Sequence, residues 1–373
     1  MKICTITCHD VYNHGASLQA YALMKYLENR GNSVEIIDYK PDYLSEHYNL
    51  FSIDNSKWKK NILTKSIYLA LKIPYKIPSL KRKKEFDKFT QKYLKITNKR
   101  YTSNDELKSD IPKADVYLCG SDQIWNSLHK NGRDKAFYLD FVPDDKIKAA
   151  YVASFATDSI EEKYQDMVKQ NVSRLDAIGV REISGVKILN KLGIDRAVNV
   201  LDPVFLLDKN EWSKIGRESF NDKYILVYDF DKNPLIEKLA KDIANKSGYK
   251  IYTINNYKSG YEKRSFRFSG PETFVSLIRN SEFVISNSFH AVAFSIIYEK
   301  QLVIVNRTEA INTRMRDLLK DMGLEHRLIN SFNYDIDKIL VKIDYKCVME
   351  KLRKKITLSK KYLDNVLNTD KSI

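Results

Sequence analysis

Long apolar segments are missing from this chain. No run approaches about 18 consecutive apolar residues, the length that a membrane-spanning helix needs. The first residues also lack the charged start, apolar middle and small-residue cleavage site of a signal peptide. We therefore expect a cytoplasmic protein. A chain of 373 residues, 43% hydrophobic and 30% charged, suits a globular enzyme with two domains, each large enough to bury its own core.

Cysteine is scarce, and its spacing does not suggest a metal site. The four cysteines, at positions 4, 8, 119 and 347, form no paired metal-binding pattern. Cys4 and Cys119 lie in apolar segments typical of strands, which suits reduced, buried thiols. The loop at residues 8–15 lacks the G-x-G-x-x-G pattern of a dinucleotide site. We expect neither a structural metal nor a bound cofactor.

Acidic residues are outnumbered by basic ones. The chain has 63 lysines and arginines against 48 aspartates and glutamates, a formal charge of +15, which favours phosphates, nucleic acid or an anionic membrane as partners. Much of the excess lies in an expected basic helical insertion at about residues 55–95. The insertion is either a solvated helix pair or a peripheral docking site for anionic lipids at the inner membrane face. Nucleic acid is less favoured, because no recognisable nucleic-acid motif accompanies the charge.

Short apolar segments alternate with helical patterns along the chain, which predicts an α/β fold. The expected strands are residues 2–7, 34–39, 114–119, 148–155, 177–180 and 198–201, then 224–228, 249–254, 283–285 and 302–305. Pro203 ends a strand just before a new α/β pattern begins, so a domain boundary is expected there. We predict doubly wound domains at residues 1–203 and 204–345, facing one another across a cleft, and a lysine-rich C-terminal helix within 346–373.

The segment at residues 283–298 is the most informative stretch. An apolar strand passes through a polar turn, with Asn287 and Ser288 as good N-cap residues, into an apolar helix that carries His290 near its start. Strand ends of open α/β sheets bind ligands, and helix N-termini there offer N–H groups to anions. His290 is thus a candidate site residue. The alternative is a histidine that caps a core helix.

A second polar turn follows the expected strand at residues 114–119. The sequence Gly120-Ser-Asp-Gln-Ile-Trp-Asn126 places a flexible glycine before a cluster of polar groups at a strand end, which is typical of a sugar or phosphate site. Here too an alternative stays open. Asp122 then caps the next turn, and Trp125 belongs to the core.

Several short motifs, in order along nearly the whole chain, resemble those of the polysaccharide pyruvyl transferase family. They are Asn13-His-Gly-Ala-Ser-Leu-Gln-Ala-Tyr-Ala-Leu23, Gly120-Ser-Asp-Gln-Ile-Trp-Asn126, Gly179-Val-Arg-Glu182, Leu201-Asp-Pro203, Gly270-Pro-Glu272, Ser286-Asn-Ser-Phe-His-Ala291 and Asn312-Thr-Arg314. The resemblance implies a fold similar to the GT-B glycosyltransferases, with two Rossmann-like domains. It also implies transfer of a pyruvyl group from phosphoenolpyruvate to two sugar hydroxyls, giving a cyclic ketal in a surface polysaccharide or its lipid-linked precursor.

The resemblance also suggests roles for individual residues. By its match to the family's histidine, His290 is the general acid that protonates the methylene carbon of phosphoenolpyruvate, and Asp122 is a candidate base. The donor's phosphate and carboxylate need cations and N–H donors. The candidates for donor binding are Arg181, Asn287, Ser288, Phe289 and Arg314. The candidates for acceptor binding are His14, Gln19, Gln123, Trp125 and Asn126.

Some features leave alternatives open. Some family members have arginine where this chain has Ser288, so phosphate binding is expected to depend more on Arg181, Arg314 and backbone donors. Arg314 could instead form a surface salt bridge, and Arg181 could pair with Glu182 at a helix start. A nucleotide-sugar glycosyltransferase is the main alternative function, because fold does not fix chemistry. A carbohydrate-binding relative without activity is the other.

Overall fold

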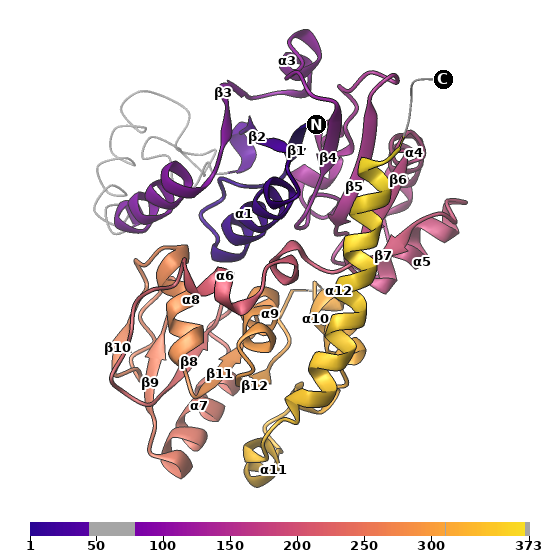
Figure 1. Ribbon diagram of the computed structural model, residues 1–373. Coiled ribbons are helices and arrows are strands. Elements are labelled where there is room, and N and C mark those ends of the chain that lie inside the picture. The colour runs from indigo at the N-terminus through magenta and orange to yellow at the C-terminus, as the bar shows by residue number, and fades with distance from the viewer. Residues whose placement is uncertain (45–78, 310, 370–373) are drawn as a thin grey trace, which may run out of the picture.

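The computed structural model describes residues 1–44, 79–309 and 311–369. Two parallel sheets flanked by helices form its two units (Figure 1). The first sheet has the strand order β3-β2-β1-β4-β5-β6-β7, and the second has the order β10-β9-β8-β11-β12. Both contain the 3-2-1-4-5 order of Rossmann-like sheets, which reverses direction between two central strands. The expected α/β class with two doubly wound sheets is therefore confirmed.

The first unit contains the N-terminal elements. They are β1 (Lys2–Ile6), α1 (His14–Asn29), β2 (Ser33–Tyr39), β3 (Ile96–Tyr101), α3 (Asn104–Ser109), β4 (Val116–Cys119), β5 (Ile147–Ala153), α4 (Glu162–Ser173), β6 (Ala177–Val180), α5 (Ile183–Lys191) and β7 (Val198–Asn199). A further helical segment covers residues 79–93. Every residue of β5 is buried, as is typical of a parallel strand with helices on both faces.

The second unit follows a short turn at Pro203–Leu206. Its elements are α6 (Lys209–Ser213), β8 (Tyr224–Tyr228), α7 (Pro234–Ser247), β9 (Lys250–Thr253), β10 (Arg264–Ser265), α8 (Pro271–Asn280), β11 (Phe283–Ser286), α9 (Phe289–Ile297), β12 (Gln301–Ile304), α10 (Thr313–Met322), α11 (Ile336–Leu340) and α12 (Tyr345–Leu367). The two sheets thus lie on either side of the boundary proposed at residue 203.

The expected and observed strands agree best in the interior of each sheet. Strands β6 and β8 have the bounds expected from the sequence, whereas β3 and β10 were not expected. Both unexpected strands form a sheet edge. Strand β3, with the sequence ITNKRY, is largely exposed and lacks a continuous apolar pattern, so nothing in its composition marks it as a strand.

Helices from both units pack together at the junction. Helix α1 of the first unit contacts α8 and α9 of the second. Trp212 is fully buried there, with its ring 4.8 Å from the Phe294 ring and 5.8 Å from the Tyr21 ring, measured between centroids. One hydrophobic cluster therefore continues from the first unit into the second, and it fixes the strand ends of both sheets relative to each other.

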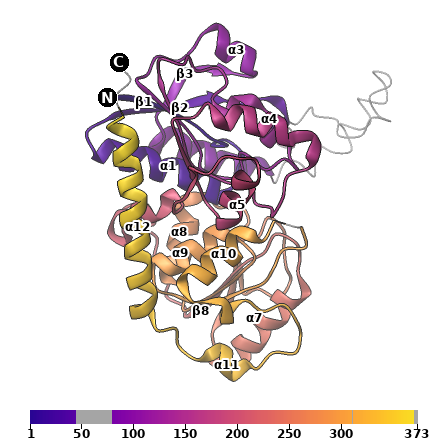
Figure 2. The ribbon, with the colours of Figure 1, turned by 90° about the vertical axis from the view of Figure 1, so that its right-hand side faces the viewer.

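Helix α12 returns to the first unit after the second is complete. In Figure 2 it runs along one side of the molecule, past both units. The Tyr362 hydroxyl donates to the carbonyl of Ala150 in β5 at 2.7 Å, and the Ser359 hydroxyl accepts from the N–H of Leu201 at 2.9 Å. Lys355 contacts both Asn199 and Asp321. The C-terminal helix is thus part of the interface between the units.

Much of the expected basic insertion, up to residue 78, lies outside the described residues. Within the helical segment at 79–93, Arg82 is buried and donates to the carbonyl of Arg267 at 3.2 Å. Arg82 therefore joins the two units, and the expectation of a fully solvated or lipid-facing basic helix is wrong for this residue. No helix in the described parts of the chain is both long enough and apolar enough to cross a membrane.

Candidate functional site

Charged side chains from both units meet where the carboxyl ends of the strands face one another. In the first unit, Asp122, Arg181 and Asp202 follow β4, β6 and β7. In the second unit, His290 lies in the first turn of α9, after β11, and Arg314 lies in the first turn of α10. Ligands of open α/β sheets bind at such strand ends. Ion-pair contacts link these five residues, which we call the strand-end cluster.

Arg181 is at the centre of the cluster. Its Nη2 forms an ion pair with Asp202 Oδ2 at 2.9 Å and donates to the Ser121 hydroxyl, and its Nη1 lies 3.8 Å from Asp122 Oδ1. The guanidinium lies 4.9 Å from the centre of the Phe289 ring, which belongs to the other unit. Arg181 is buried, and its Nε and Nη1 have no hydrogen-bond partner among the described residues. It therefore keeps N–H groups with which to bind an anion.

Asp202 joins this guanidinium to the histidine. Its Oδ1 accepts from the Val204 N–H at 3.1 Å, and its Oδ2 lies 3.7 Å from His290 Nε2. Burial alone would raise the pKa of Asp202, but the charge of Arg181 and the contact with His290 lower the pKa to about 2. Asp202 is therefore ionised at neutral pH. It balances the charge of Arg181 and places a carboxylate beside the imidazole.

His290 is held between the two units. Ser288 caps α9 by accepting from the Ala291 N–H at 3.4 Å, which fixes the turn that carries His290. On its other side the ring lies against Gly15 in the first turn of α1, where an added Cβ would come within 1.9 Å of His290 Nδ1. Within the described part of the chain, His290 Nε2 has no hydrogen-bond partner. Glycine at position 15 thus leaves the space that the imidazole fills.

Arg314 supplies a second guanidinium. Its Nη1 lies 3.6 Å from Asp122 Oδ1, and its guanidinium lies 5.7 Å from the centre of the same Phe289 ring. Burial, and then the charge of Arg181, lower the pKa of Arg314 to about 10, so it is still protonated at neutral pH. Because the side chain is buried, the alternative of a surface salt bridge does not fit. Phe289 lies under both arginines and keeps them side by side.

Glu182 supports the neighbouring loop. Its Oε1 accepts from the N–H groups of Phe155 at 2.8 Å and Ala156 at 3.0 Å, and from the Ser154 hydroxyl at 3.2 Å. Burial raises the pKa of this carboxyl group. In the described contacts Glu182 does not form an ion pair with Arg181, so the alternative of an ordinary pair at the helix start does not fit. Glu182 is a scaffold residue beneath the cluster.

The loop after β4 fixes the backbone of Asp122. Its φ angle of 78° lies in the left-handed region, which aspartate and asparagine tolerate better than most residues. Its carbonyl accepts from the N–H groups of Ile124 at 2.8 Å and Ser154 at 3.0 Å. At Gly120, which has a φ of 120°, a Cβ would lie 2.0 Å from the Tyr151 carbonyl oxygen. The Asp122 side chain, by contrast, is 18% exposed. Within the described residues its carboxylate makes ion-pair contacts and no hydrogen bond.

The other predicted donor residues act on the backbone. The Asn287 side chain accepts from the Phe230 N–H at 3.1 Å and donates to Asp229 at 2.9 Å, so it braces the loop after β8. Ser288 is the N-cap described above. Neither side chain points a free donor at the cluster, and their contribution is to hold the turn that carries Phe289 and His290.

His14 is not part of the strand-end cluster and lies among aromatic rings. Its ring stacks on Phe274 with centroids 5.0 Å apart and an interplanar angle of 7°, and it lies 5.0 Å from the Phe86 ring. His14 Nε2 is 3.2 Å from Arg82 Nη2. Burial, and then the charge of Arg82, hold the pKa of His14 well below its usual value, so the ring is neutral. In this position His14 joins the two units and has no surface for a sugar.

Gln19 and Trp125 are also enclosed. Gln19 accepts from the Ser121 N–H at 3.1 Å and donates to the Thr7 hydroxyl at 2.9 Å, so it braces the loop after β4. The fully buried Trp125 stacks on Tyr138 with centroids 5.3 Å apart and donates its indole N–H to the Phe137 carbonyl at 3.0 Å. The core alternative therefore fits Trp125 better than contact with a sugar.

Gln123 is the predicted acceptor residue that stays partly exposed. Its side-chain oxygen accepts from Asn126 at 2.9 Å, and Asn126 itself is fully buried. The structure thus brings the predicted catalytic and donor-side residues together around Arg181. Most of the predicted acceptor residues instead support the loop from behind. Gln123 and Asp122 are the two with a face toward solvent.

Four contributors to the site were not predicted from the sequence: Gly15, Ser121, Glu182 and Asp202. Each stands inside one of the motifs that carry the family resemblance. Asp202 directly precedes Pro203, and the proline, which marks the expected domain boundary, dominates that pattern. Its place in a motif, next to a strand end, was the available signal.

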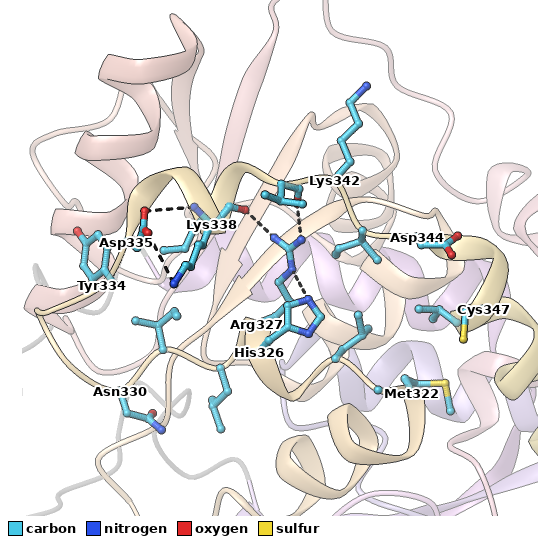
Figure 3. A pocket seen from close by; sticks show the side chains of 18 of the residues that line it. Met322, His326, Arg327, Asn330, Tyr334, Asp335, Lys338, Lys342, Asp344 and Cys347 are labelled. Carbon is cyan, nitrogen blue, oxygen red and sulfur yellow. Dashed lines mark hydrogen bonds and ion pairs between the residues drawn. The ribbon is translucent and has the colours of Figure 1, made fainter.

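The described residues offer no group of three or more histidines, cysteines, aspartates or glutamates that would hold a metal ion. A cavity of about 660 Å³ opens at the far end of the second unit, between the ends of α10, α11 and α12 (Figure 3). Arg327 there donates to the backbone carbonyls of Ile339 and Val341, and to His326 Nε2 at 3.1 Å. Its guanidinium is therefore used to hold the chain in place, and none of the predicted site residues lines this cavity.

Comparison with solved structures finds likenesses over almost the whole chain. Arabidopsis thaliana UGT89C1 complexed with UDP-L-rhamnose has a TM-score of 0.49 and 10% identity, covering 98% of each chain. S. aureus MnaA with UDP has a TM-score of 0.49 and 11% identity, covering 95% of this chain and 90% of that chain. The spinosyn rhamnosyltransferase SpnG has a TM-score of 0.46 and 10% identity, covering 99% and 100%. Likenesses at this level carry no argument about substrate or reaction.

Sequence comparison is more specific. No curated protein matches the sequence. The family model described as polysaccharide pyruvyl transferase matches residues 13–309, a range that includes Asp122, Arg181, Asp202 and His290. The match covers most of the chain, including every named strand except β1, and it ends just before Arg314. The chain belongs to the polysaccharide pyruvyl transferase family.

Proposed function

We propose that the protein transfers the pyruvyl group of phosphoenolpyruvate to two hydroxyls of a sugar, forming a cyclic ketal during surface polysaccharide biosynthesis. The observation that carries this proposal is the strand-end cluster, in which two buried guanidiniums with unused N–H groups lie near a buried histidine. Family membership supports a transferase that acts on polysaccharides. The proposed setting is the cytoplasm, with an acceptor that is a polysaccharide or a lipid-linked precursor.

The charges of the cluster suit the donor. Phosphoenolpyruvate carries a phosphate and a carboxylate, and arginine binds both groups through paired N–H donors. Arg181 and Arg314 come from different units and lie over one aromatic ring, so an anion between them contacts both units. Burial strengthens these contacts, because charges attract more strongly where water is excluded. Ser288, at the position where some relatives have arginine, leaves this task to Arg181 and Arg314.

The proposed reaction begins with proton transfer. His290 gives a proton to the methylene carbon of the donor, which leaves positive character on the adjacent carbon. One sugar hydroxyl bonds to that carbon, and its proton passes to a base, for which Asp122 is the candidate. The bond between that carbon and the phosphate oxygen then breaks, releasing phosphate. The second hydroxyl closes the ketal ring and its proton passes to His290, while the proton that Asp122 took up leaves with the phosphate, so both groups return to their starting states.

Calorimetric titration tests the donor. We expect phosphoenolpyruvate to bind the unmodified protein and to bind Arg181→Ala at least tenfold more weakly, since a buried charge-assisted contact contributes about 1.5–3 kcal/mol. Arg217→Ala, which removes an exposed arginine, serves as the matched control and should bind as the unmodified protein does. Near-ultraviolet circular dichroism checks that Arg181→Ala is folded.

A panel of nucleotide sugars in the same titration separates the alternatives. Binding of a nucleotide sugar without binding of phosphoenolpyruvate would favour glycosyl transfer and remove the proposed role of His290. Binding of sugars alone, with no phosphate release in the presence of phosphoenolpyruvate, would favour a carbohydrate-binding protein without transferase activity.

A further inference from the structure

Asp122 occupies an unusual place between two positive charges. Its Oδ1 lies 3.8 Å from Nη1 of Arg181 and 3.6 Å from Nη1 of Arg314. Both distances exceed hydrogen-bond length, although each pair is close enough for strong attraction. One carboxylate oxygen thus faces two guanidiniums from opposite units, which is the position that an anionic ligand shared by these arginines would take.

The side chain of Asp122 is held there by charge alone. Among the described residues no hydrogen bond reaches its carboxylate, and the side chain is 18% exposed. Its backbone, in contrast, is fixed by bonds from Ile124 and Ser154. Rotation of the side chain about its own bonds therefore breaks no hydrogen bond within the described structure and leaves the loop where it is. The neighbouring Asp202 differs, because it is buried and its carboxylate accepts hydrogen bonds from the Ser121 hydroxyl and the Val204 N–H.

The two guanidiniums require an anion between them. Both lie over the Phe289 ring, and the charge of Arg181 acts unfavourably on Arg314. Asp202 balances Arg181, whereas Arg314 has its ion-pair contact, within the described part of the chain, with Asp122. If Asp122 turned away with nothing in its place, Arg314 would stay buried without its ion-pair contact, which is unfavourable. Release of Asp122 is therefore coupled to the arrival of another anion.

We propose that, without donor, the Asp122 carboxylate occupies the position of the donor's anionic group. When the donor binds, its anionic group takes this position between Arg181 and Arg314, and the Asp122 carboxylate turns toward the acceptor. The proposal rests on the proposed function, because it takes phosphoenolpyruvate as the source of that anion. It adds an order of events: the base becomes available to a sugar hydroxyl once the donor is bound. Without donor, Asp122 stays between the two arginines and does not face the acceptor.

Replacing the carboxylate of Asp122 by an amide tests this exchange. Asp122→Asn keeps the shape of the side chain and suits the left-handed backbone at this position, so we expect it to fold. Because the anion no longer competes with a like charge, inorganic phosphate and phosphoenolpyruvate should each bind about tenfold more tightly than to the unmodified protein. Loss of structure weakens binding, so a gain in affinity is a result that damage cannot produce.

Asp166→Asn is the matched control. Asp166 is an exposed aspartate on α4, and its replacement changes the net charge by the same amount without touching the cluster. We expect unchanged affinity for both anions. If Asp122→Asn binds phosphate and phosphoenolpyruvate no more tightly than Asp166→Asn does, the exchange is refuted. A gain in both variants would also refute it, because net charge alone would then explain the effect.

The two anions distinguish this proposal from the proposed function. Tighter phosphate binding by Asp122→Asn, with no binding of phosphoenolpyruvate to any variant, would support the exchange and overturn the donor assignment. Phosphoenolpyruvate binding to the unmodified protein, with no gain in Asp122→Asn, would support the donor assignment and overturn the exchange. Absence of binding of either anion to all three proteins would overturn both.

Discussion

Two buried histidines lie at the junction of the units, and each is in the first turn of a helix that follows a strand of a parallel sheet. His14 begins α1, and His290 is the second residue of α9. His14 has aromatic rings and Arg82 around it, whereas His290 has Asp202 beside it. The local setting of the two residues is therefore similar, and their neighbours differ in charge.

This difference in charge distinguishes His14, which has a structural role, from His290, which is the candidate for proton transfer. Burial and a neighbouring cation keep His14 neutral, so its ring serves as an aromatic plate between the units. His290 lies against a carboxylate, in a cluster with unused N–H groups, as a residue that transfers protons to an anionic substrate requires. Position at a helix start does not decide the role of a histidine. The charged neighbour decides it, which is Arg82 for His14 and Asp202 for His290.

The largest expected effect is the loss of reaction rate when His290 is replaced. His290→Ala should lower the rate of phosphate release from phosphoenolpyruvate, in the presence of a sugar acceptor, by about 10²–10⁴-fold, because a general acid contributes that much. Folding should be retained, which circular dichroism checks. A fully active His290→Ala protein would remove this residue from the mechanism.

The structural member should show the opposite pattern. His14→Ala removes a fully buried ring that stacks on Phe274, and we expect a loss of about 3 kcal/mol in the free energy of unfolding, as for other large-to-small changes in a core. Urea unfolding measures it. His14→Phe keeps the ring volume and should recover much of the stability. A stable His14→Ala protein without activity would show that the contrast between the two histidines is wrong.

The pH dependence of stability also distinguishes the surroundings of His14 from those of His290, because His14 and Asp202 titrate in different pH ranges. His14 has a folded-state pKa well below 6.5, so the unfolded state binds a proton first and stability falls as pH drops below 6.5. Asp202 has a folded-state pKa of about 2, below its unfolded value of 3.8, so it stabilises the fold above pH 3.8. That contribution, about 2 kcal/mol, is lost as pH falls from 3.8 toward 2.

Unfolding free energies at a series of pH values test both windows. His14→Phe should reduce the loss that begins below pH 6.5, to which His326 also contributes, and Asp202→Asn should reduce the loss below pH 3.8, to which Asp144 also contributes. Unchanged slopes in either variant would show that the residue does not titrate as its surroundings require.

The smallest expected effect concerns the space that His290 occupies. In Gly15→Ala the added methyl group would overlap the imidazole, so the ring must move, and we expect about a tenfold loss in turnover with a modest change in stability. Gly185→Ala is the matched control, because the nearest atom to its added Cβ is 3.3 Å away. Equal activity of the two variants would show that the exact place of the ring does not matter.

The sequence predicted the strands in the sheet interiors and the residues that converge on Arg181, because both depend on local patterns. It did not reveal which side of a loop each residue faces. Gln19 lies in helix α1 and Trp125 in the loop after β4, and their partners, Ser121 and Tyr138, come from other parts of the chain. Strand β3 is a polar edge strand and depends on its pairing with β2, which composition does not show.

Helix α12 has a consequence for how the chain folds. It covers Ala150 and Gly179 in the first sheet, although it is made of residues 345–367. During synthesis, domains generally fold as units from the N-terminus, but here one face of the first unit stays uncovered until the second has left the ribosome. Completion of the first unit is thus delayed until α12 has been synthesised. Truncation before α12 should therefore expose apolar surface on the N-terminal sheet as well as on the second unit.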